Sequence, residues 1–515
     1  MQSLIRLARM LKLLSRRLTG LASNTPDTPM IPGENRGFYS SPIGYSVFPG
    51  RGAVGVAVLS SGSRVYVLMR SVYGGRNAFA PVASALAASG LDVRIRIVES
   101  SPEPIARELL ARGRRVVVMY GVTSPAFLEL AGEIHRVSRI APTIVGGPHA
   151  AGAYWQVLRL GAAAAVVGDG EIAAVEVVER VAEGMGLEEP PSNTAVRSGG
   201  RFKVGPVALA SLDDYTPHYP QLGLYPPIEI MRGCSYRCRF CQVPWEFKSQ
   251  VRFRSVGSVA KAAADYVAAG KREIRFIAPI GFAYGSEDLR TPNPAAVEEL
   301  LSSVRAVGGK PYLGSFPSET RPEFVTPEIL RVVRRLAYNR RISIGLQSGS
   351  DMLLERIGRG HGVDEAVRAA GLALEHGFTP VVDIIFGMPG EDEEDVVETV
   401  KAMYRLSEMG ARLRLHHFLP LPGTPFARIP PKPLHPLYRR AVLKLLGRGV
   451  LEGYWREQER LGLEIYCMTA LDPAPTREPQ PLRGSERLCS SVWKAIAPAR
   501  LEPYSGVVEG LEHRA

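Results

Sequence analysis

The amino-acid sequence predicts two successive α/β domains, a doubly wound parallel sheet followed by an open, partial (β/α)6 barrel. Two observations carry this prediction. Short β-branched strands alternate with helical segments in two separate series, and the strands in both series are largely apolar. Apolar strands separated by helices are typical of parallel sheets covered on both faces. The 515 residues suffice for several domains with cores of their own.

Composition is that of a soluble globular protein, with 45% hydrophobic and 22% charged residues. No run of eighteen uncharged apolar residues occurs, so no membrane span is predicted. The net charge of +12 is compatible with a nucleic-acid partner. Because Arg and Lys are scattered, we favour a solvated basic surface over a nucleic-acid interface. A cytoplasmic location is expected because no secretion signal is found.

Residues 1–61 are predicted to form a basic extension and a linker. Leucines recur at helical spacing among five Lys and Arg in the first twenty residues. This pattern indicates either an amphipathic surface helix or a frayed extension. Residues 24–50 are rich in Pro, Gly, Ser and Asn, which is typical of a linker.

The first α/β domain is predicted over residues 62–186 and is flavodoxin-like (Rossmann-like). Its strands are expected at 64–69, 93–98, 115–120, 143–145 and 164–167, with helices at 78–89, 103–112, 124–140 and 171–183. Ligands of such sheets bind beyond the carboxyl ends of the strands. Two loops there contain paired glycines: Gly146 and Gly147, and Gly168 and Gly170. Either loop alone is also compatible with a plain tight turn, but together they predict a binding face.

The second α/β domain is predicted over residues 227–428, after a linker at 187–226 that contains a small hairpin (194–197 and 202–204). Its strands are expected at 228–231, 273–278, 311–315, 341–346, 380–386 and 412–418. Six units are too few for a closed eightfold barrel, so the barrel is predicted to be partial. Residues 429–515, beyond a Pro-rich stretch, are expected to form a small C-terminal appendage without assigned chemistry.

A three-cysteine loop follows the first strand of the second domain. Cys234, Cys238 and Cys241 are spaced CxxxCxxC, and the sequence contains five cysteines in all. Thiolates at this spacing can wrap one iron–sulfur cluster and leave one iron of a [4Fe–4S] cubane open. Structural zinc usually needs four N or S ligands, so we favour iron–sulfur over zinc. Arg232, Arg237 and Arg239 are expected to moderate the charge of the cluster.

With these motifs, residues 228–426 resemble the radical S-adenosylmethionine (SAM) superfamily. Three further strand ends carry the resemblance: residues 345–350 (GLQSGS), 383–391 (DIIFGMPGE) and 419–425 (LPLPGTP). The resemblance implies the following cofactor-binding residues for SAM: Phe240, Gln347, Ser348, Gly387 and Glu391. It implies reductive cleavage of SAM to a 5′-deoxyadenosyl radical, with an electron donor such as ferredoxin or flavodoxin.

A doubly wound domain ahead of such a barrel resembles the cobalamin (B12)-binding radical SAM subgroup of uncharacterised, archaeal-type proteins. This resemblance implies cobalamin and methyl transfer to an unreactive carbon of an unknown substrate. The DxHxxG loop of histidine-ligated corrinoid domains is absent, which excludes one binding mode but not the cofactor. His149 is a candidate ligand, but we favour a solvated loop histidine.

Three alternatives stay open. They are a cobalamin-independent radical rearrangement or cyclisation, an RNA methylthiotransferase, and a non-catalytic corrinoid-binding protein. The methylthiotransferase is disfavoured because relatives of that class carry a second three-cysteine cluster, whereas no cysteine precedes Cys234 here.

Overall fold

The computed structural model describes residues 39–40, 64–72, 75–472 and 489 of the chain. The predictions for residues 1–61 therefore lie outside the described residues, apart from β1 (Tyr39–Ser40), which pairs with β3 in antiparallel fashion. No helix in the described ranges combines the length and the apolar character needed to cross a bilayer.

The first domain is built on five parallel strands: β2 (Val65–Arg70), β3 (Val93–Val98), β4 (Arg115–Gly121), β5 (Thr143–Gly146) and β6 (Ala164–Val166). They lie in the order β3-β2-β4-β5-β6. The order reverses between β2 and β4, so the carboxyl ends of these strands form the switch point of a doubly wound sheet. The predicted flavodoxin-like class is confirmed.

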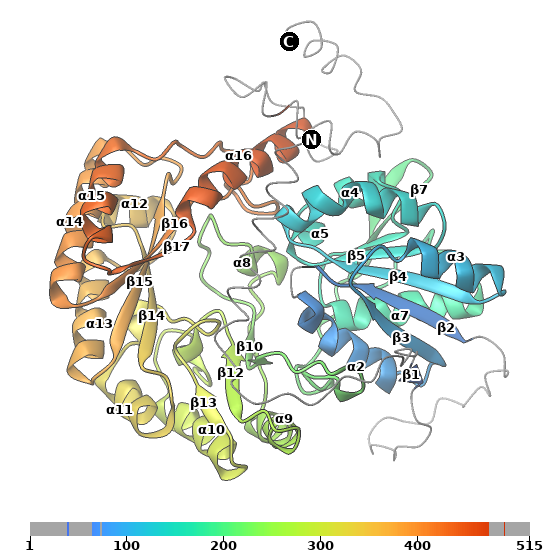
Figure 1. The fold of residues 1–515 in the computed structure, drawn as a ribbon, viewed down its shortest axis with the longest axis horizontal. Coiled ribbons are helices and arrows are strands. Elements are labelled where there is room, and N and C mark those ends of the chain that lie inside the picture. The colour runs from blue at the N-terminus through green and yellow to red at the C-terminus, as the bar shows by residue number, and fades with distance from the viewer. Residues whose placement is uncertain (1–38, 41–63, 73–74, 473–488, 490–515) are drawn as a thin grey trace, which may run out of the picture. The chain divides into compact units, whose positions relative to one another are not determined.

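Helices cover both faces of this sheet (Figure 1). They are α2 (Ala80–Ala88), α3 (Glu103–Ala111), α4 (Ser124–Ser138), α5 (Pro148–Gly152), α6 (Tyr154–Arg159) and α7 (Gly170–Glu183). The sheet continues past its predicted end at residue 186. The hairpin β7 (Thr194–Ser198) and β8 (Arg201–Val204) pairs with β6 in antiparallel fashion, so the segment assigned to a linker extends the first domain.

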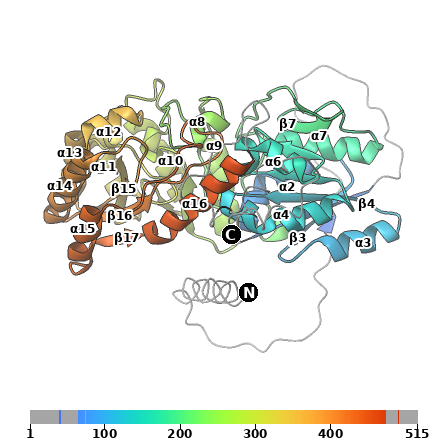
Figure 2. The same ribbon diagram turned by 90° about the horizontal axis from the view of Figure 1, so that it is seen from above.

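The second domain contains six parallel strands: β9 (Ile228–Glu229), β12 (Glu273–Ile277), β13 (Lys310–Tyr312), β14 (Arg341–Gln347), β15 (Thr379–Phe386) and β16 (Arg412–His417). A parallel bridge between Thr320 and Ile344 joins the β9-β12-β13 group to the group that begins with β14. Figures 1 and 2 show the helices α11 (Pro327–Leu336), α13 (Val363–Glu375) and α14 (Glu393–Met409) outside these strands. Two further helices of this domain are α9 (Val256–Ala268) and α10 (Pro294–Ala306).

The barrel sheet also extends into the segment that the sequence analysis assigns to the appendage. After α15 (Pro436–Leu446), β17 (Leu451–Gly453) pairs with β16 in parallel, and α16 (Trp455–Leu471) follows. The sequence did not reveal β17 for two reasons. The Pro-rich stretch before α15 has the composition of a domain boundary. A strand of three residues is also too short to show a recognisable alternation of apolar and polar residues.

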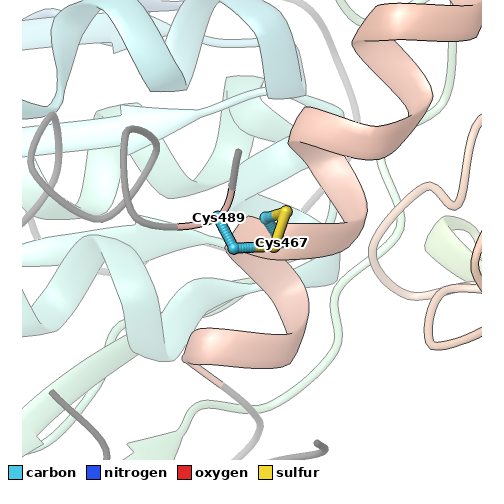
Figure 3. The surroundings of a disulfide bond; sticks show 2 residues. All are labelled: Cys467 and Cys489. Carbon is cyan, nitrogen blue, oxygen red and sulfur yellow. A yellow bond between two sulfur atoms is a disulfide. The ribbon is translucent and has the colours of Figure 1, made fainter. Parts of the chain in front are cut away.

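A disulfide bond and hydrogen bonds fix the C-terminal end of α16. Cys467 on this helix forms a disulfide bond with Cys489 (Figure 3). The carbonyl of Asp472 accepts hydrogen bonds from Trp155 Nε1 at 2.9 Å and Gln156 Nε2 at 2.8 Å, both on α6 of the first domain. The last two cysteines of the sequence are thus joined to each other.

Candidate functional site

The three-cysteine loop lies between β10 (Met231–Arg232) and α8 (Val243–Glu246), and β10 pairs with β11 (Arg252–Phe253) in antiparallel fashion. All three cysteines are free thiols. Cys234 and Cys238 are buried, and Cys241 is partly exposed. The Cys241 amide donates to the Cys238 carbonyl at 3.2 Å, which closes a turn between these two residues. The sequence spacing therefore becomes one compact loop.

Gly233 sets the path of this loop. Its φ is +84°, and a Cβ placed on it would lie 1.8 Å from the carbonyl oxygen of Gln250. Both conditions exclude an ordinary L side chain unless the neighbouring backbone moves.

We expect Gly233→Ala to lower the iron content after reconstitution severalfold and to destabilise the fold by at least about 1–3 kcal/mol, the usual cost of such backbone strain. Chemical iron analysis and urea unfolding measure the two effects. Gly257→Ala is the matched control, because a Cβ there meets no atom within 4 Å. Equal behaviour of the two variants would contradict the close approach at Gly233.

The chemistry of the thiols fits a metal cluster. Burial, together with the neighbouring cysteines, raises the pKa of the Cys241 thiol to about 12, and burial raises that of Cys234. Metal binding requires thiolates and supplies the positive charge that offsets their burial. Within the described part of the chain, no three His, Cys, Asp or Glu side chains converge on a single ion. Each thiolate of a cubane binds a different iron, so such convergence is not required.

Two arginines that the sequence analysis did not identify lie next to the cysteine loop. Arg359 Nη1 lies 3.4 Å from Cys238 Sγ, and Arg321 Nη1 lies 3.9 Å from the same atom. Of the arginines expected in this role, Arg237 and Arg239 are exposed. Arg321 and Arg359 are far from the cysteines in sequence, so no local pattern indicates them.

Arg232 has a different role from the one expected, because carboxylates surround its guanidinium. It binds Asp169 at 2.9 Å, Glu171 at 2.7 Å and Glu229 at 2.6 Å, and only 7% of Arg232 is exposed. Asp169 and Glu171 belong to the glycine-rich loop after β6 and the start of α7. We call these four residues the Arg232 clamp. The clamp neutralises Arg232 and joins the cysteine loop to the first domain.

A cavity of about 240 Å³ lies beside the Arg232 clamp. Its walls include all four glycines predicted to bind a cofactor: Gly146, Gly147, Gly168 and Gly170. Phe79, Val82, Met119, Ile144 and Ala174 form much of its apolar lining. Glu246 also lines the cavity, and burial raises its pKa to about 7. The carboxyl ends of β4, β5 and β6 thus open into one chamber.

His149 does not line this chamber and is not solvated, contrary to expectation. It is fully buried, its ring stacks on Phe127 at 4.0 Å, and its Nδ1 lies 3.2 Å from Ser124 Oγ. Burial lowers its pKa to about 3. The loop begins helix α5, which turns His149 toward α4. No histidine lines the cavity among the residues that the structure describes.

Four of the five residues predicted to bind SAM lie at or after the carboxyl ends of β14 and β15, and Phe240 lies in the cysteine loop. Gln347 ends β14 with a φ of +83°, an unusual conformation for a side-chain-bearing residue. Ser348 Oγ contacts Thr399 Oγ1 on α14 at 3.1 Å. Phe240 is partly buried against the barrel core. Their contacts with SAM remain predictions.

Gly387 and Glu391 form a braced loop after β15. Glu391 accepts hydrogen bonds from the Gly387 amide at 3.2 Å and from Tyr438 Oη at 2.7 Å. Burial raises the pKa of Glu391 to about 7. Both carboxylate oxygens are therefore engaged in holding this loop against α15.

The inner strands carry a charged network that the sequence analysis missed. Arg414 on β16 binds Glu319 at 2.6 Å, Glu452 at 3.1 Å and Asp383 at 3.3 Å. Charged residues alternate with leucines along β16 (RLRLHH). This two-residue period could have indicated a charged face on β16, because alternate side chains of a strand lie on the same face.

Family models match both domains. Residues 228–403 match the radical SAM superfamily, and residues 67–178 match the B12 binding domain. The chain therefore carries a radical SAM domain at residues 228–403 and, ahead of it, a B12 binding domain at residues 67–178. These matches confirm the predicted class and the three cofactors predicted from it, a [4Fe–4S] cluster, SAM and cobalamin.

Curated relatives resemble part of the chain. An uncharacterised protein of Methanopyrus kandleri is 30% identical over 40% of this chain and 40% of its own length. A tRNA-2-methylthio-N(6)-dimethylallyladenosine synthase of Pelobacter propionicus is 30% identical over 41% of this chain and 49% of its own length. The chain thus spans about half or less of these relatives.

Solved structures share the fold. The radical SAM methyltransferase TsrM from Kitasatospora setae, with cobalamin and a [4Fe–4S] cluster bound, aligns with a TM-score of 0.57 at 18% identity, covering 72% of this chain and 76% of TsrM. The cobalamin-dependent enzyme OxsB, with aqua-cobalamin and SAM bound, aligns with a TM-score of 0.57 at 16% identity, covering 80% of this chain and 66% of OxsB. At this identity the likeness establishes the fold alone.

Proposed function

We propose that the protein is a cobalamin-dependent radical SAM enzyme that transfers a methyl group to an unreactive carbon of a substrate not yet identified. One observation carries the proposal. The free-cysteine loop and the glycine-lined cavity share a wall, because Arg232 precedes the cysteine loop and also lines the cavity. Two cofactor sites so placed suit a reaction that needs both cofactors.

Different residues would bind the cluster and SAM. Cys234, Cys238 and Cys241 would hold the cluster, and Phe240, Gln347, Ser348 and the Gly387–Glu391 loop would surround SAM. The bound cluster and SAM supply a 5′-deoxyadenosyl radical. Asp383, which is buried, and Arg414, which pairs with it, would carry charge on the inner strands of the barrel.

Gly146, Gly147, Gly168 and Gly170 would admit cobalamin. The cavity volume of about 240 Å³ is below the roughly 300–1,000 Å³ typical of small-molecule pockets, so it would take only a part of the cofactor and not the whole ring.

A ferredoxin- or flavodoxin-type donor would supply the electron, and the cytoplasm is the expected location. The methylthiotransferase remains the second candidate, because the matched relatives include an enzyme named for that reaction. The disulfide between Cys467 and Cys489 argues against it, since these two cysteines are engaged with each other and offer no second cluster site.

Anaerobic reconstitution with iron and sulfide, with and without cobalamin, tests the proposal. We expect a [4Fe–4S] EPR signal that changes when SAM is added, 5′-deoxyadenosine under reductant, and a corrinoid spectrum that survives desalting. The variant with Cys234, Cys238 and Cys241 all replaced by Ala should lose the signal and reduce deoxyadenosine to background.

The matched control replaces Cys467 and Cys489 by Ala, which also removes cysteine side chains but should leave the cluster intact. If wild type makes no more deoxyadenosine than the triple variant, the radical SAM proposal fails. If the corrinoid is lost on desalting while deoxyadenosine forms, the cobalamin-independent alternative replaces methyl transfer.

A further inference from the structure

Arg359 is the more closely placed of the two arginines at the cysteine loop. It lies between α12 (Asp351–Arg356) and α13, and only 6% of it is exposed. Besides Cys238 Sγ, its guanidinium contacts the Gly345 carbonyl through Nη2 and His361 Nε2 through Nε at 3.1 Å. Three anchors from different segments therefore fix the guanidinium against the sulfur.

No carboxylate of the described residues forms an ion pair with Arg359. Among the described residues, its polar partners are a carbonyl, an imidazole and a thiol sulfur. Burial lowers the pKa of His361 to about 3, so this ring accepts the hydrogen bond in its neutral form. A buried cation without a counter-ion is costly, so the site calls for an anion next to Arg359.

Arg321 provides a contrast within the same site. It is 4% exposed and lies farther from Cys238, but Glu323 pairs with its Nε at 2.5 Å. Its guanidinium also lies 3.5 Å from the centroid of the Tyr236 ring. Arg321 is therefore neutralised locally, whereas Arg359 has its positive charge available to the cysteine loop.

We propose that Arg359 is a positioning residue of the cluster site that holds the Cys238 sulfur and makes reduction of the cluster more favourable. The inference rests on the proposed function. Reduction adds one electron from the low-potential donor, so the cluster and its three thiolates become one charge more negative. A fixed, buried positive charge stabilises that reduced state more than the oxidised one, because screening by solvent is weak there.

EPR-monitored redox titration of the reconstituted full-length protein, without SAM, tests this inference. For Arg359→Met we expect the ratio of reduced to oxidised cluster at a fixed potential to fall about tenfold, equivalent to about 59 mV for a one-electron couple. Arg359→Lys should recover most of the ratio because it keeps the charge. If Arg359→Met does not retain a cluster, Arg359→Gln is titrated instead, and the same fall is expected.

Three control variants change other charged residues near the cysteine loop. Arg237→Met and Arg239→Met remove exposed charges from the same loop, and the double variant Arg321→Met with Glu323→Gln removes a neutral pair. Each should change the ratio less than about twofold, because exposed charges are screened and the pair has no net charge. A shift in these controls as large as that of Arg359→Met would overturn the inference.

SAM binding distinguishes the remaining possibility, that Arg359 binds the carboxylate of SAM. The affinity of the oxidised protein for SAM is measured on the same variants. An unchanged reduction potential with weakened SAM binding would overturn the inference and assign Arg359 to SAM. Wild type without a cluster or without deoxyadenosine would instead defeat the proposed function. Wild type that is active, with Arg359→Met titrating identically, would defeat only the role of Arg359.

Discussion

Arg232→Met is expected to lower the free energy of unfolding by about 3–5 kcal/mol, the usual cost of breaking a buried ion pair. The substitution leaves Glu171 and Glu229 without their cation. Asp169 keeps Arg252 as a partner, so the loss falls mainly on the two glutamates. Urea unfolding, monitored by circular dichroism, measures this change.

Arg232→Met should also disturb the cysteine loop, because Arg232 lies next to Gly233 and two residues before Cys234. We expect less iron per chain after reconstitution of Arg232→Met. Arg331→Met is the matched control: its ion pair with Glu328 leaves the two side chains 64% and 55% exposed, and such pairs contribute only about 0.2–1 kcal/mol.

Two results would weigh against the Arg232 clamp. One is an Arg232→Met variant as stable as Arg331→Met. The other is simple additivity in the double variant Arg232→Met with Glu171→Gln. Residues in one ion-pair network are expected to show a coupling energy, so neutralising Glu171 should recover part of the lost stability.

The sequence was sufficient to predict that the glycine-rich loops of the first domain meet at one edge of its sheet. The glycines after β5 and β6 are far apart in the chain, yet the carboxyl ends of parallel strands meet at one edge, and all four line one cavity. The cysteine spacing likewise predicted one loop. Both predictions depend on local pattern and on a topology that apolar strands and helices indicate well.

The sequence did not predict which charges meet the cysteines. Proximity in the chain suggested Arg232, but Met231 packs in the barrel core and the Arg232 side chain reaches the acids of the first domain. Arg359 contacts Cys238 only because the fold brings α12 and the loop after it against the cysteine loop. Such contacts depend on tertiary packing, and no periodic pattern in the sequence predicts them.

Val82→Trp should lower the retention of cobalamin by at least tenfold without loss of the cluster. Val82 lies on α2, lines the cavity and is partly exposed, so an indole there can enter the chamber without displacing the buried core. A tenfold loss of cobalamin affinity corresponds to about 1.4 kcal/mol. A bulky indole ring in the space that the cofactor occupies is expected to cost at least this much. Corrinoid absorbance after desalting and a binding titration measure the effect, while EPR reports the cluster.

Ala88→Trp supplies the matched control for Val82→Trp, since Ala88 lies on the same helix, is exposed and does not line the cavity. It should bind cobalamin as wild type does. If Val82→Trp also binds normally, the cofactor does not use this cavity, and the four glycines around it are turns of the fold. If Val82→Trp loses the cluster as well, the chamber supports the cysteine loop structurally, and cobalamin must be located by other means.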